Sequence, residues 1–283
     1  MECFHTIRIR DPSPDRDGYI NVPCQKCFAC QSNKRREWEF RCKVELNHSV
    51  CSYTVTYTYD NEHLPAPEKF FIDDPLTHSE PRFYYYHPFR IKDLQDFHKL
   101  LRKELSFRFF GVAEYGGKFG RPHYHVIYFF TVPVYKDSFE RLVRKLWQHG
   151  IQITVDVTDE RCIGYTTKYC VKMFNDISPR SQLLTSRRPG IGTSYVSTSV
   201  TNYLHSLDTD CIKYQDMSIR LPRIIRDRVY SQDEKDLHTL KLLSFSYKND
   251  EKLSKLGDPD SLRTHQKEVF INQCIKSLKN QKL

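Results

Sequence analysis

The sequence has no hydrophobic run long enough to cross a membrane. Its longest apolar stretch, Val126 to Val134, is interrupted by Thr131 and Pro133, and a helical span needs ~20 apolar residues. The first residues, MECFHTIRIRDPSPDRD, contain no apolar segment of a secretory signal. Both absences argue against a membrane protein and against an exported one, so we expect no membrane partner and a cytoplasmic location.

Two further absences narrow the class of protein. The chain shows no internal repeat, and it has no glycine-rich loop ending in Gly-Lys-Ser or Gly-Lys-Thr, the loop that holds the phosphates of ATP in many motor proteins. We therefore expect a globular protein that does not itself unwind a duplex.

The composition of the 283 residues indicates a packed, basic protein. Hydrophobic residues make up 39%, with 18 Tyr and 18 Phe, which is typical of a folded chain rather than a disordered one. The 44 Lys and Arg outnumber the 35 Asp and Glu, for a formal net charge of +9. A positive surplus suits a polyanionic partner, a nucleic acid or a membrane surface, and the lack of apolar segments favours nucleic acid.

Three regions differ in texture. Residues 1–50 form a cysteine-rich segment followed by a charged helix expected at 32–46, with Ser32 or Asn33 as its N-cap. Residues 176–283 begin with a basic loop and are expected to be mostly helical, with helices near 232–248 and 260–280.

The middle region, 51–175, alternates strand-like and helix-like segments. Its β-branched and aromatic runs predict strands, and its amphipathic runs predict helices. The strands are expected at 51–59, 106–115, 123–132 and 151–157, and the helices at 90–105, 137–150 and 161–174, with a polar insertion at 60–88. This order predicts an α+β fold in which helices pack on an antiparallel sheet.

The first candidate site lies at the start of the strand HYHVIYFFTV. His123 and His125 are two residues apart, so in a strand both imidazoles project from the same face. Glu114 ends the preceding strand, and a short loop brings the chain back beside it. A His/His/Glu set suits Mg²⁺ or Mn²⁺ acting on a phosphate oxygen; the alternative is a hydrogen-bonded histidine pair without a metal.

The second candidate site is YTTKY at 165–169. Tyr165 and Tyr169 are four residues apart and would share one face of a helix. Lys168 and Lys172 follow closely and could meet phosphate charge. The alternative is an amphipathic face that packs on the sheet.

The cysteine cluster is a third feature. Cys24, Cys27 and Cys30 supply three thiolates from one turn-rich loop, and Cys3 is the expected fourth ligand of a structural Zn²⁺. His5 and Cys42 compete with Cys3 for that place. An iron–sulfur cluster fits less well, because position 34 is a lysine and no Cys-Pro pair follows, and unliganded thiols remain an alternative.

The motifs resemble a known family. The segment Glu114 to His125, EYGGKFGRPHYH, looks like the metal motif of the HUH endonucleases, and YTTKY resembles their two-tyrosine helix. More narrowly, the chain is similar to the replication initiation proteins of small single-stranded DNA phages, the gokushovirus branch of the microviruses. The further supporting segments are PCQKCFAC at 23–30, REWEFR at 36–41, TVTYTYDNEHLP at 54–65 and SRRPGIG at 186–192.

This resemblance implies a metal-dependent DNA endonuclease and strand transferase with the HUH fold. His123, His125 and Glu114 would hold the metal, Tyr165 and Tyr169 would be alternating nucleophiles, and Lys168 would support the cleaved phosphate. The enzyme would nick origin DNA, form a 5′-phosphotyrosine link and rejoin the strand in rolling-circle replication.

The resemblance also implies partners. These are single-stranded and supercoiled origin DNA, with a host helicase and polymerase in the host cytoplasm. Arg121, Lys172, Arg187 and Arg188 are expected to contact DNA, although the arginine pair would equally suit a basic surface turn. The alternatives are an HUH relaxase or transposase, and a non-catalytic zinc-bearing nucleic-acid-binding protein.

Overall fold

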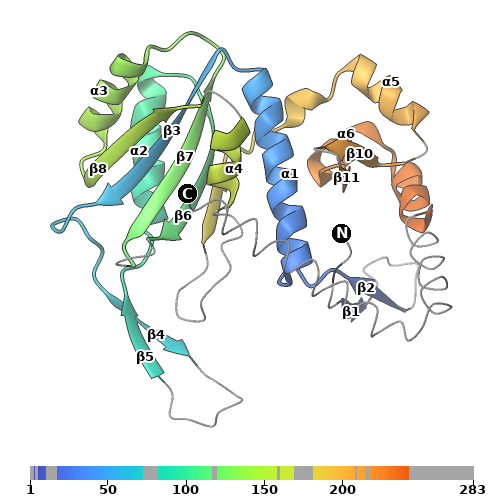
Figure 1. Ribbon diagram of the computed structural model, residues 1–283, viewed down its shortest axis with the longest axis horizontal. Coiled ribbons are helices and arrows are strands. Elements are labelled where there is room, and N and C mark those ends of the chain that lie inside the picture. The colour runs from blue at the N-terminus through green and yellow to red at the C-terminus, as the bar shows by residue number, and fades with distance from the viewer. Residues whose placement is uncertain are drawn as a thin grey trace. The chain divides into compact units, whose positions relative to one another are not determined.

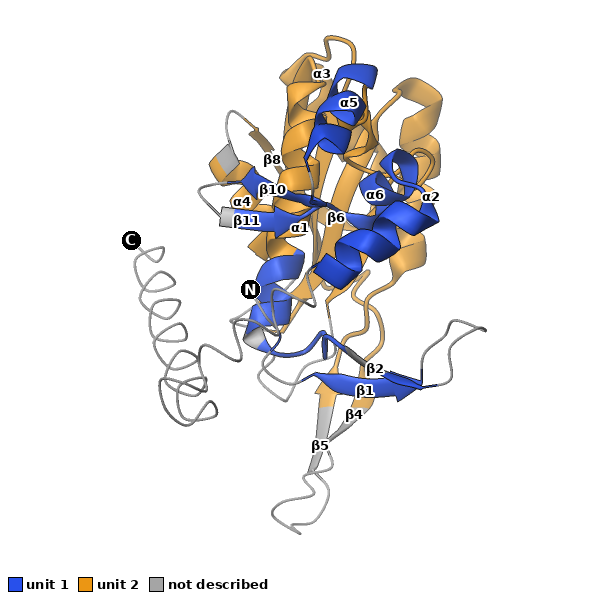
Figure 2. Cartoon of the chain, turned by 90° about the vertical axis from the view of Figure 1, so that its right-hand side faces the viewer, with its two compact units in different colours: residues 1–34, 198–283 blue, residues 35–197 orange. Residues whose placement is uncertain are grey.

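A computed structural model of the chain describes residues 3, 6–10, 18–72, 82–116, 120–157, 160–168, 181–207, 209–214 and 217–241. Tyr169, Lys172, His5 and the helix expected near 260–280 lie outside the described residues. The chain forms two compact units, coloured differently in Figure 2. The sheet unit comprises residues 35–197, and the terminal unit comprises residues 1–34 and 198–283.

The sheet unit is built on a five-stranded antiparallel sheet (Figure 1). Its strand order is β8-β3-β7-β6-β9. The bounds are β3 Cys51–Tyr59, β6 Arg108–Tyr115, β7 Pro122–Phe130, β8 Gly150–Asp156 and β9 Gln182–Thr185. The expected α+β class with an antiparallel sheet is confirmed, and β9 is an additional strand in a segment that was expected to be a loop.

One face of the sheet packs against α2 (Ile91–Glu104) and α3 (Lys136–Leu146). Both helices carry apolar residues at helical spacing, and each points them to the sheet. The strands answer with alternate large side chains, among them Tyr57, Tyr124 and Tyr128, all fully buried. The core of this face therefore consists largely of tyrosine rings whose hydroxyls bond one another, Tyr57 to Tyr128 and Tyr59 to Tyr124.

The other face packs against α1 (Phe28–Asn47) and α4 (Glu160–Lys168). Trp38 and Cys42 of α1 and Ile163 of α4 join Phe110 and Ile127 of the sheet in a second core cluster. The N-cap expected at Ser32 or Asn33 is wrong, because α1 already begins at Phe28. Its first turn therefore includes Cys30, a residue of the cysteine cluster.

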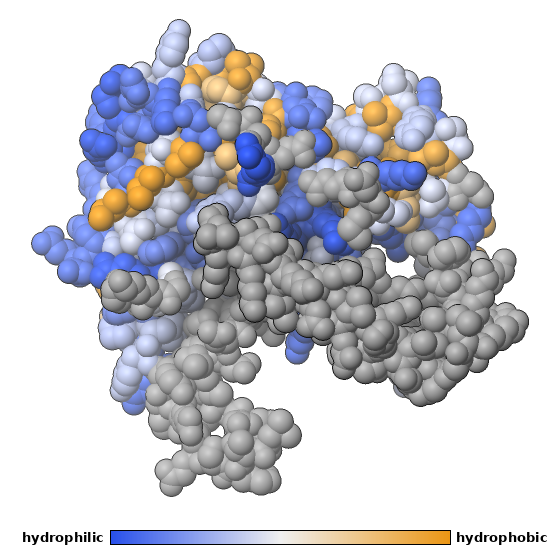
Figure 3. All heavy atoms as spheres, in the orientation of Figure 1, coloured by the Kyte–Doolittle hydropathy of each residue, from blue (hydrophilic) through white to orange (hydrophobic). Residues whose placement is uncertain are grey.

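The edge strand β8 exposes an apolar stripe. Its side chains alternate between half-buried and exposed, and Ile151, Ile153 and Val155 are 63%, 61% and 53% exposed. They form the hydrophobic stripe that follows β8 in Figure 3. By register, they lie on the face of the sheet that carries Thr54, Thr56 and Thr58 of β3.

Hairpins account for the other strands. The insertion at 60–88 contains β4 (Glu68–Ile72) paired with β5 (Arg82–Tyr86), and the cysteine-rich segment contains β1 (Ile7–Arg10) paired with β2 (Tyr19–Val22). Neither hairpin was predicted, because turn residues dominate both segments and hide their short strands.

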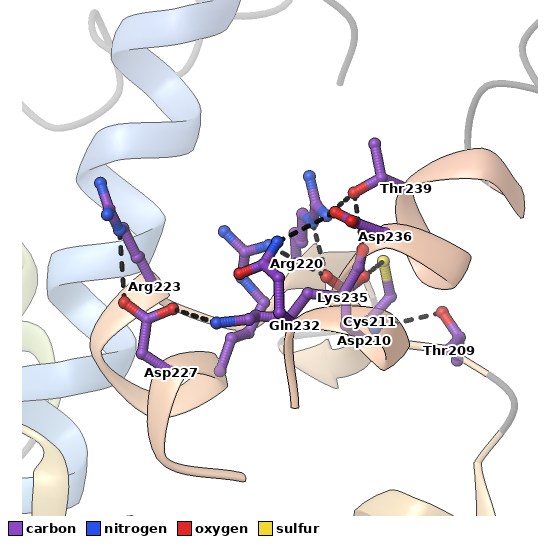
Figure 4. Close-up of polar contacts among 11 residues, drawn as sticks. Thr209, Asp210, Cys211, Arg220, Arg223, Asp227, Gln232, Lys235, Asp236 and Thr239 are labelled. Carbon is purple, nitrogen blue, oxygen red and sulfur yellow. Dashed lines mark hydrogen bonds and ion pairs between the residues drawn. The ribbon is translucent and has the colours of Figure 1, made fainter. Parts of the chain in front are cut away.

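The C-terminal part of the terminal unit combines helices with a hairpin. It contains α5 (Thr198–Ser206), β10 (Cys211–Tyr214) paired with β11 (Met217–Arg220), and α6 (Arg223–Val229). Residues 232–241 are helical, which confirms the described part of the helix expected near 232–248. Asp210 is buried and bonds Arg220 and Arg226, while Asp227 bonds Arg223 and Lys235 (Figure 4). Among the described residues, no helix has the length and hydropathy of a membrane span.

Candidate active site

The register of the sheet places the two histidines beside the predicted carboxylate. Strand β7 runs between β6 and β3, so that His123 pairs with Glu114 on one side and with Thr58 on the other. His125 pairs with Thr56. These side chains all project from the face covered by α1 and α4, as the spacing of the two histidines predicted for that pair.

Glu114 and His125 touch. The Oε1 atom of Glu114 lies 3.0 Å from Nε2 of His125, and the two residues are 4% and 6% exposed. The other ring nitrogen, Nδ1, lies 3.0 Å from Oγ1 of Thr56. If Nδ1 donates to Thr56, Nε2 directs its lone pair to the carboxylate oxygen, so the two lone pairs need a cation or a proton between them. The donor set therefore fits a divalent metal.

His123 stands next to this pair in a different orientation. Its ring centre is 6.4 Å from that of His125, and its Nδ1 is 3.0 Å from the carbonyl oxygen of Pro122. The structure thus brings Glu114 and His125 into contact and leaves His123 beside them. Within the described part of the chain, the ligand atoms that gather in a group of three or more are those of four cysteines, so the His/His/Glu set is not closed in this conformation.

Gly116 keeps one edge of the His123 ring open. A Cβ atom at Gly116 would lie 2.9 Å from Nε2 of His123, closer than a carbon and a nitrogen can pack. The backbone hydrogen bond from the N–H of Gly116 to the carbonyl oxygen of Arg121 fixes the glycine in the loop between the two strands. Nε2 is therefore the nitrogen of His123 that this loop leaves room to approach.

Tyr165 of α4 lies over the same face. Its ring centre is 6.5 Å from that of His125, with the ring planes perpendicular, and the residue is 54% exposed. The Nζ atom of Lys168 lies 5.3 Å from the centre of the Tyr165 ring. The structure therefore gathers Tyr165, Lys168 and His125, while Tyr169 and Lys172 fall outside the described residues.

Two residues of α1 support α4 from below. Arg35 donates a hydrogen bond from Nε to Glu39 (2.7 Å) and one from Nη2 to the carbonyl of Gly164 (3.4 Å). Thr167 donates from Oγ1 to Glu39 at 3.3 Å and to its own helix at the carbonyl of Ile163. Sequence reasoning assigned no role to Arg35 or Glu39; their i,i+4 spacing of opposite charges was the available signal.

The tyrosines of the opposite face are poor nucleophiles. Tyr124 lies between His123 and His125 in the chain but points to the other side of the sheet, where its hydroxyl bonds that of Tyr59. Burial raises the pKa of Tyr124 to about 12 and the pKa of Tyr57 well above its usual value. Phenolate formation there costs more than in water, so these rings serve the core.

Arg121 is tied to the protein. Its guanidinium donates from Nη1 to the carbonyl of Tyr59 (2.9 Å) and from Nη2 to Asn61 (2.7 Å). These bonds fasten the loop before His123 to the end of β3. A contact between Arg121 and DNA stays a prediction.

Arg187 and Arg188 are presented by an anchored turn. Both are exposed, and residue 187 pairs with residue 190 across the turn. Arg108 donates to the carbonyls of Pro189 and Gly190 (2.9 and 2.8 Å). Arg108 is itself held by the buried carboxylate of Glu45, at 2.7 and 2.9 Å. The two arginines therefore project from a fixed turn, which lowers the entropy cost when they bind a ligand.

The cysteine cluster forms as expected with Cys3 as its fourth member. The four sulfurs, from Cys3, Cys24, Cys27 and Cys30, lie within 4.8 Å of one another and could hold a metal ion. Cys42, the described competitor, is buried in the second core cluster instead.

Comparison with known proteins adds a family relation. Residues 51–174 match the family model of the replication-associated protein ORF2. The chain is 27% identical over 182 residues to the replication-associated protein ORF4 of Chlamydia phage 1, covering 56% of this chain and 42% of that protein. It is 26% identical over 166 residues to the replication-associated protein ORF2 of Spiroplasma virus 4, covering 54% and 48%.

A third relative is the replication-associated protein VP4 of Bdellovibrio phage phiMH2K, which is 30% identical over 169 residues, covering 53% of this chain and 48% of that protein. The chain thus matches about half the length of these curated relatives. No solved structure matches it. The resemblance drawn from the motifs is confirmed, and the chain is a relative of the replication-associated proteins of these phages.

Proposed function

We propose that the protein is a replication initiator that nicks an origin DNA strand by tyrosine attack and later rejoins it. The observation that carries this proposal is the placement of the exposed Tyr165 ring 6.5 Å from His125, whose Nε2 faces the buried carboxylate of Glu114. A phenol beside a metal-binding pair is the arrangement that phosphodiester attack needs. The HUH fold is part of this proposal, with the catalytic core within residues 51–175.

Glu114, His125 and His123 would hold Mg²⁺ or Mn²⁺. The contact between Glu114 and His125 supports this assignment, as does the loop at Gly116 that leaves room at Nε2 of His123. Bound there, the metal would polarise a phosphate oxygen. Thr56 would keep the His125 ring in the orientation that directs Nε2 to the metal.

The reaction starts from Tyr165, or from Tyr169 one helical turn later. The phenol oxygen forms a bond to phosphorus, and the bond from phosphorus to the 3′ oxygen of the preceding nucleotide breaks. The phenol loses a proton and the 3′ oxygen gains one, so the products are a 5′-phosphotyrosine and a free 3′-OH. Lys168, beside the Tyr165 ring, would meet the charge of the phosphate.

The second tyrosine closes the cycle. While one phosphotyrosine persists, the other tyrosine cleaves the regenerated origin, and the freed 3′-OH attacks the first phosphotyrosine to seal a circle. Arg35 and Glu39 would position α4 for both steps through Gly164 and Thr167. Holding the nucleophile in place in this way contributes to the rate.

The DNA strand would cross the face of the sheet that carries the site. The exposed Ile151, Ile153 and Val155 of β8 offer an apolar surface to unstacked bases. The anchored turn offers Arg187 and Arg188 to the phosphates, and Lys172 and Arg121 are proposed contacts as well. A host helicase and polymerase would complete replication inside the host cytoplasm.

The test uses single-stranded oligonucleotides tiled across the genome that encodes the chain, with Mn²⁺ or Mg²⁺. The full-length protein should form a covalent adduct with one of them. Tyr165→Phe and Tyr169→Phe should each retain some adduct, and the double variant should form none while folding normally, because Phe fills nearly the same volume. Tyr135→Phe, at an 81% exposed tyrosine on another element, is the matched control. An adduct in the double variant would remove the nucleophile from α4.

The metal ligands are tested in the same assay. His123→Ala/His125→Ala should abolish nicking and largely spare DNA binding, since binding rests on distributed basic contacts. His87→Ala, on a loop outside the site, is the control. Retained nicking in the double variant would contradict the metal assignment. DNA binding by the wild type without any nicking would favour the alternative of a non-catalytic nucleic-acid-binding protein.

A further inference from the structure

The four cysteines near the N-terminus take no part in the proposed reaction. They lie in the terminal unit and come from two places in the chain. Cys3 and Cys27 are 24 positions apart, yet their sulfurs lie 3.8 Å from each other. All four sulfurs lie within 4.8 Å of one another. We propose that Cys3, Cys24, Cys27 and Cys30 bind one Zn²⁺ ion in a closed, structural site.

The sulfur spacing carries the argument. Four sulfurs placed tetrahedrally around one zinc, each at about 2.3 Å, are separated by about 3.8 Å. The distance between the sulfurs of Cys3 and Cys27 matches this edge. A disulfide would hold two sulfurs at about 2.05 Å, so these two cysteines are reduced. A cluster of several irons would spread its four cysteines further apart than a single ion does.

The backbone around Cys24 supplies the second reason. Its sulfur accepts hydrogen bonds from the N–H groups of Lys26 (3.4 Å) and Cys27 (3.2 Å). The N–H of Cys24 in turn donates to the sulfur of Cys3 at 3.2 Å. Amide donors around a sulfur stabilise its thiolate form, which is the form that binds zinc.

The helix that follows completes the geometry. Cys27 directly precedes α1, and Cys30 lies in its first turn, with the N–H of Gln31 bonded to the carbonyl of Cys27. The positive end of the helix dipole favours thiolates at this position. Positive φ at Gln25 (60°) turns the chain sharply between Cys24 and Cys27, so that both sulfurs face the same point.

A Cys₄ set leaves no position for water or substrate. Zinc sites of this kind contribute to folding rather than to chemistry. Here the ion would join the chain at residue 3 to the start of α1, closing a long loop that contains the hairpin β1–β2. This segment has few buried apolar residues of its own, since the four residues of β1 are all exposed. A metal cross-link would therefore supply the stability that its small core lacks.

The test is metal content in the full-length protein, purified without chelator. We expect one zinc per chain in the wild type and in the His123→Ala/His125→Ala variant, which separates this ion from the catalytic metal. Cys27→Ser should lower the zinc content to near zero. Cys211→Ser, at a half-buried cysteine outside the cluster, should leave it at one.

A second measurement covers the case in which Cys27→Ser fails to fold. Wild-type protein in which cobalt has replaced zinc should show the intense visible bands and the sulfur-to-cobalt charge-transfer band of a tetrahedral tetrathiolate site, and chelation should lower the melting temperature. Well-folded protein with a zinc content near zero would overturn the proposal. So would iron in place of zinc with a cluster spectrum, or zinc that disappears with the two histidines. Failure of nicking would leave this zinc unaffected.

Discussion

Gly116 offers a test of the active site that alters no ligand. An ideal Cβ atom at this position would lie 2.9 Å from Nε2 of His123 and 3.4 Å from its Cδ2. Ordinary contacts between such atoms begin at about 3.5 Å. The backbone of Gly116 does not adopt a positive φ, so Gly116→Ala should fold, and the ring of His123 must retreat by about 0.6 Å.

The size of the effect follows from that displacement. A misplacement of about 1 Å in a catalytic group can cost about 10²-fold in rate, so about 0.6 Å should cost roughly tenfold, or about 1.4 kcal/mol of transition-state stabilisation. If Nε2 of His123 binds the metal, the metal concentration for half-maximal nicking should rise as well, because the new methyl group covers that nitrogen.

The assay is single-turnover nicking of the cognate oligonucleotide over a range of Mn²⁺ concentrations, with DNA affinity measured in parallel. Gly18→Ala is the matched control, since a Cβ there would meet nothing within 4 Å. An unchanged rate and an unchanged metal dependence in folded Gly116→Ala protein would refute the reasoning. The ligand role of His123 would then have to be abandoned.

Two other predictions concern acid stability and DNA affinity. Burial lowers the pKa of His98 from 6.5 to about 3, so the fold favours the neutral ring, and the stability that this provides is present above pH 6.5 and is lost as the pH falls toward 3. The free energy of unfolding should therefore drop by about 2 kcal/mol between pH 7 and pH 5 on account of this residue; in urea titrations His98→Gln should remove that drop, whereas Phe97→Leu should keep it, and an unchanged drop in His98→Gln would contradict the buried neutral ring. Arg187→Gln/Arg188→Gln should reduce the slope of log affinity against log salt by about 0.7 for each phosphate of a single strand that the turn no longer neutralises, without changing the nicking rate at saturating DNA; an unchanged slope would mean that the turn does not bind phosphate.

Much of the sheet unit was predictable from local pattern. The alternation of CSYTVTYTY and the paired aromatics of HYHVIYFF predicted β3 and β7, and both lie within two residues of the expected positions. The amphipathic runs likewise predicted α2 and α3. The hairpin β4–β5 was missed because its strands are short and lie between turn residues, so periodicity over five residues does not stand out.

The placement of α1 shows a different limit. Its sequence is charged on all sides, so no apolar face marks where the helix begins, and the structure starts it at Phe28. Trp38 and Cys42 reach the core while Arg35 and Glu39 reach α4. Helices of this kind are held by tertiary contacts rather than by their own pattern.

For the candidate site, the sequence by itself determined which side chains share a face. The two-residue spacing of His123 and His125 is enough to align them, because a strand alternates its side chains whatever surrounds it. The spacing of Cys24, Cys27 and Cys30 likewise places three thiolates in one turn. These are local properties of the backbone, and they hold before the chain folds.

Only the tertiary structure decided which residues meet. It set Glu114 against His125 rather than against its cross-strand neighbour His123, and it brought Tyr165 to the same face. It also selected Cys3 for the cysteine cluster and buried Cys42 in the core. Contacts between residues far apart in the chain depend on register and on the packing of whole elements, and a pattern within one segment carries no information about either.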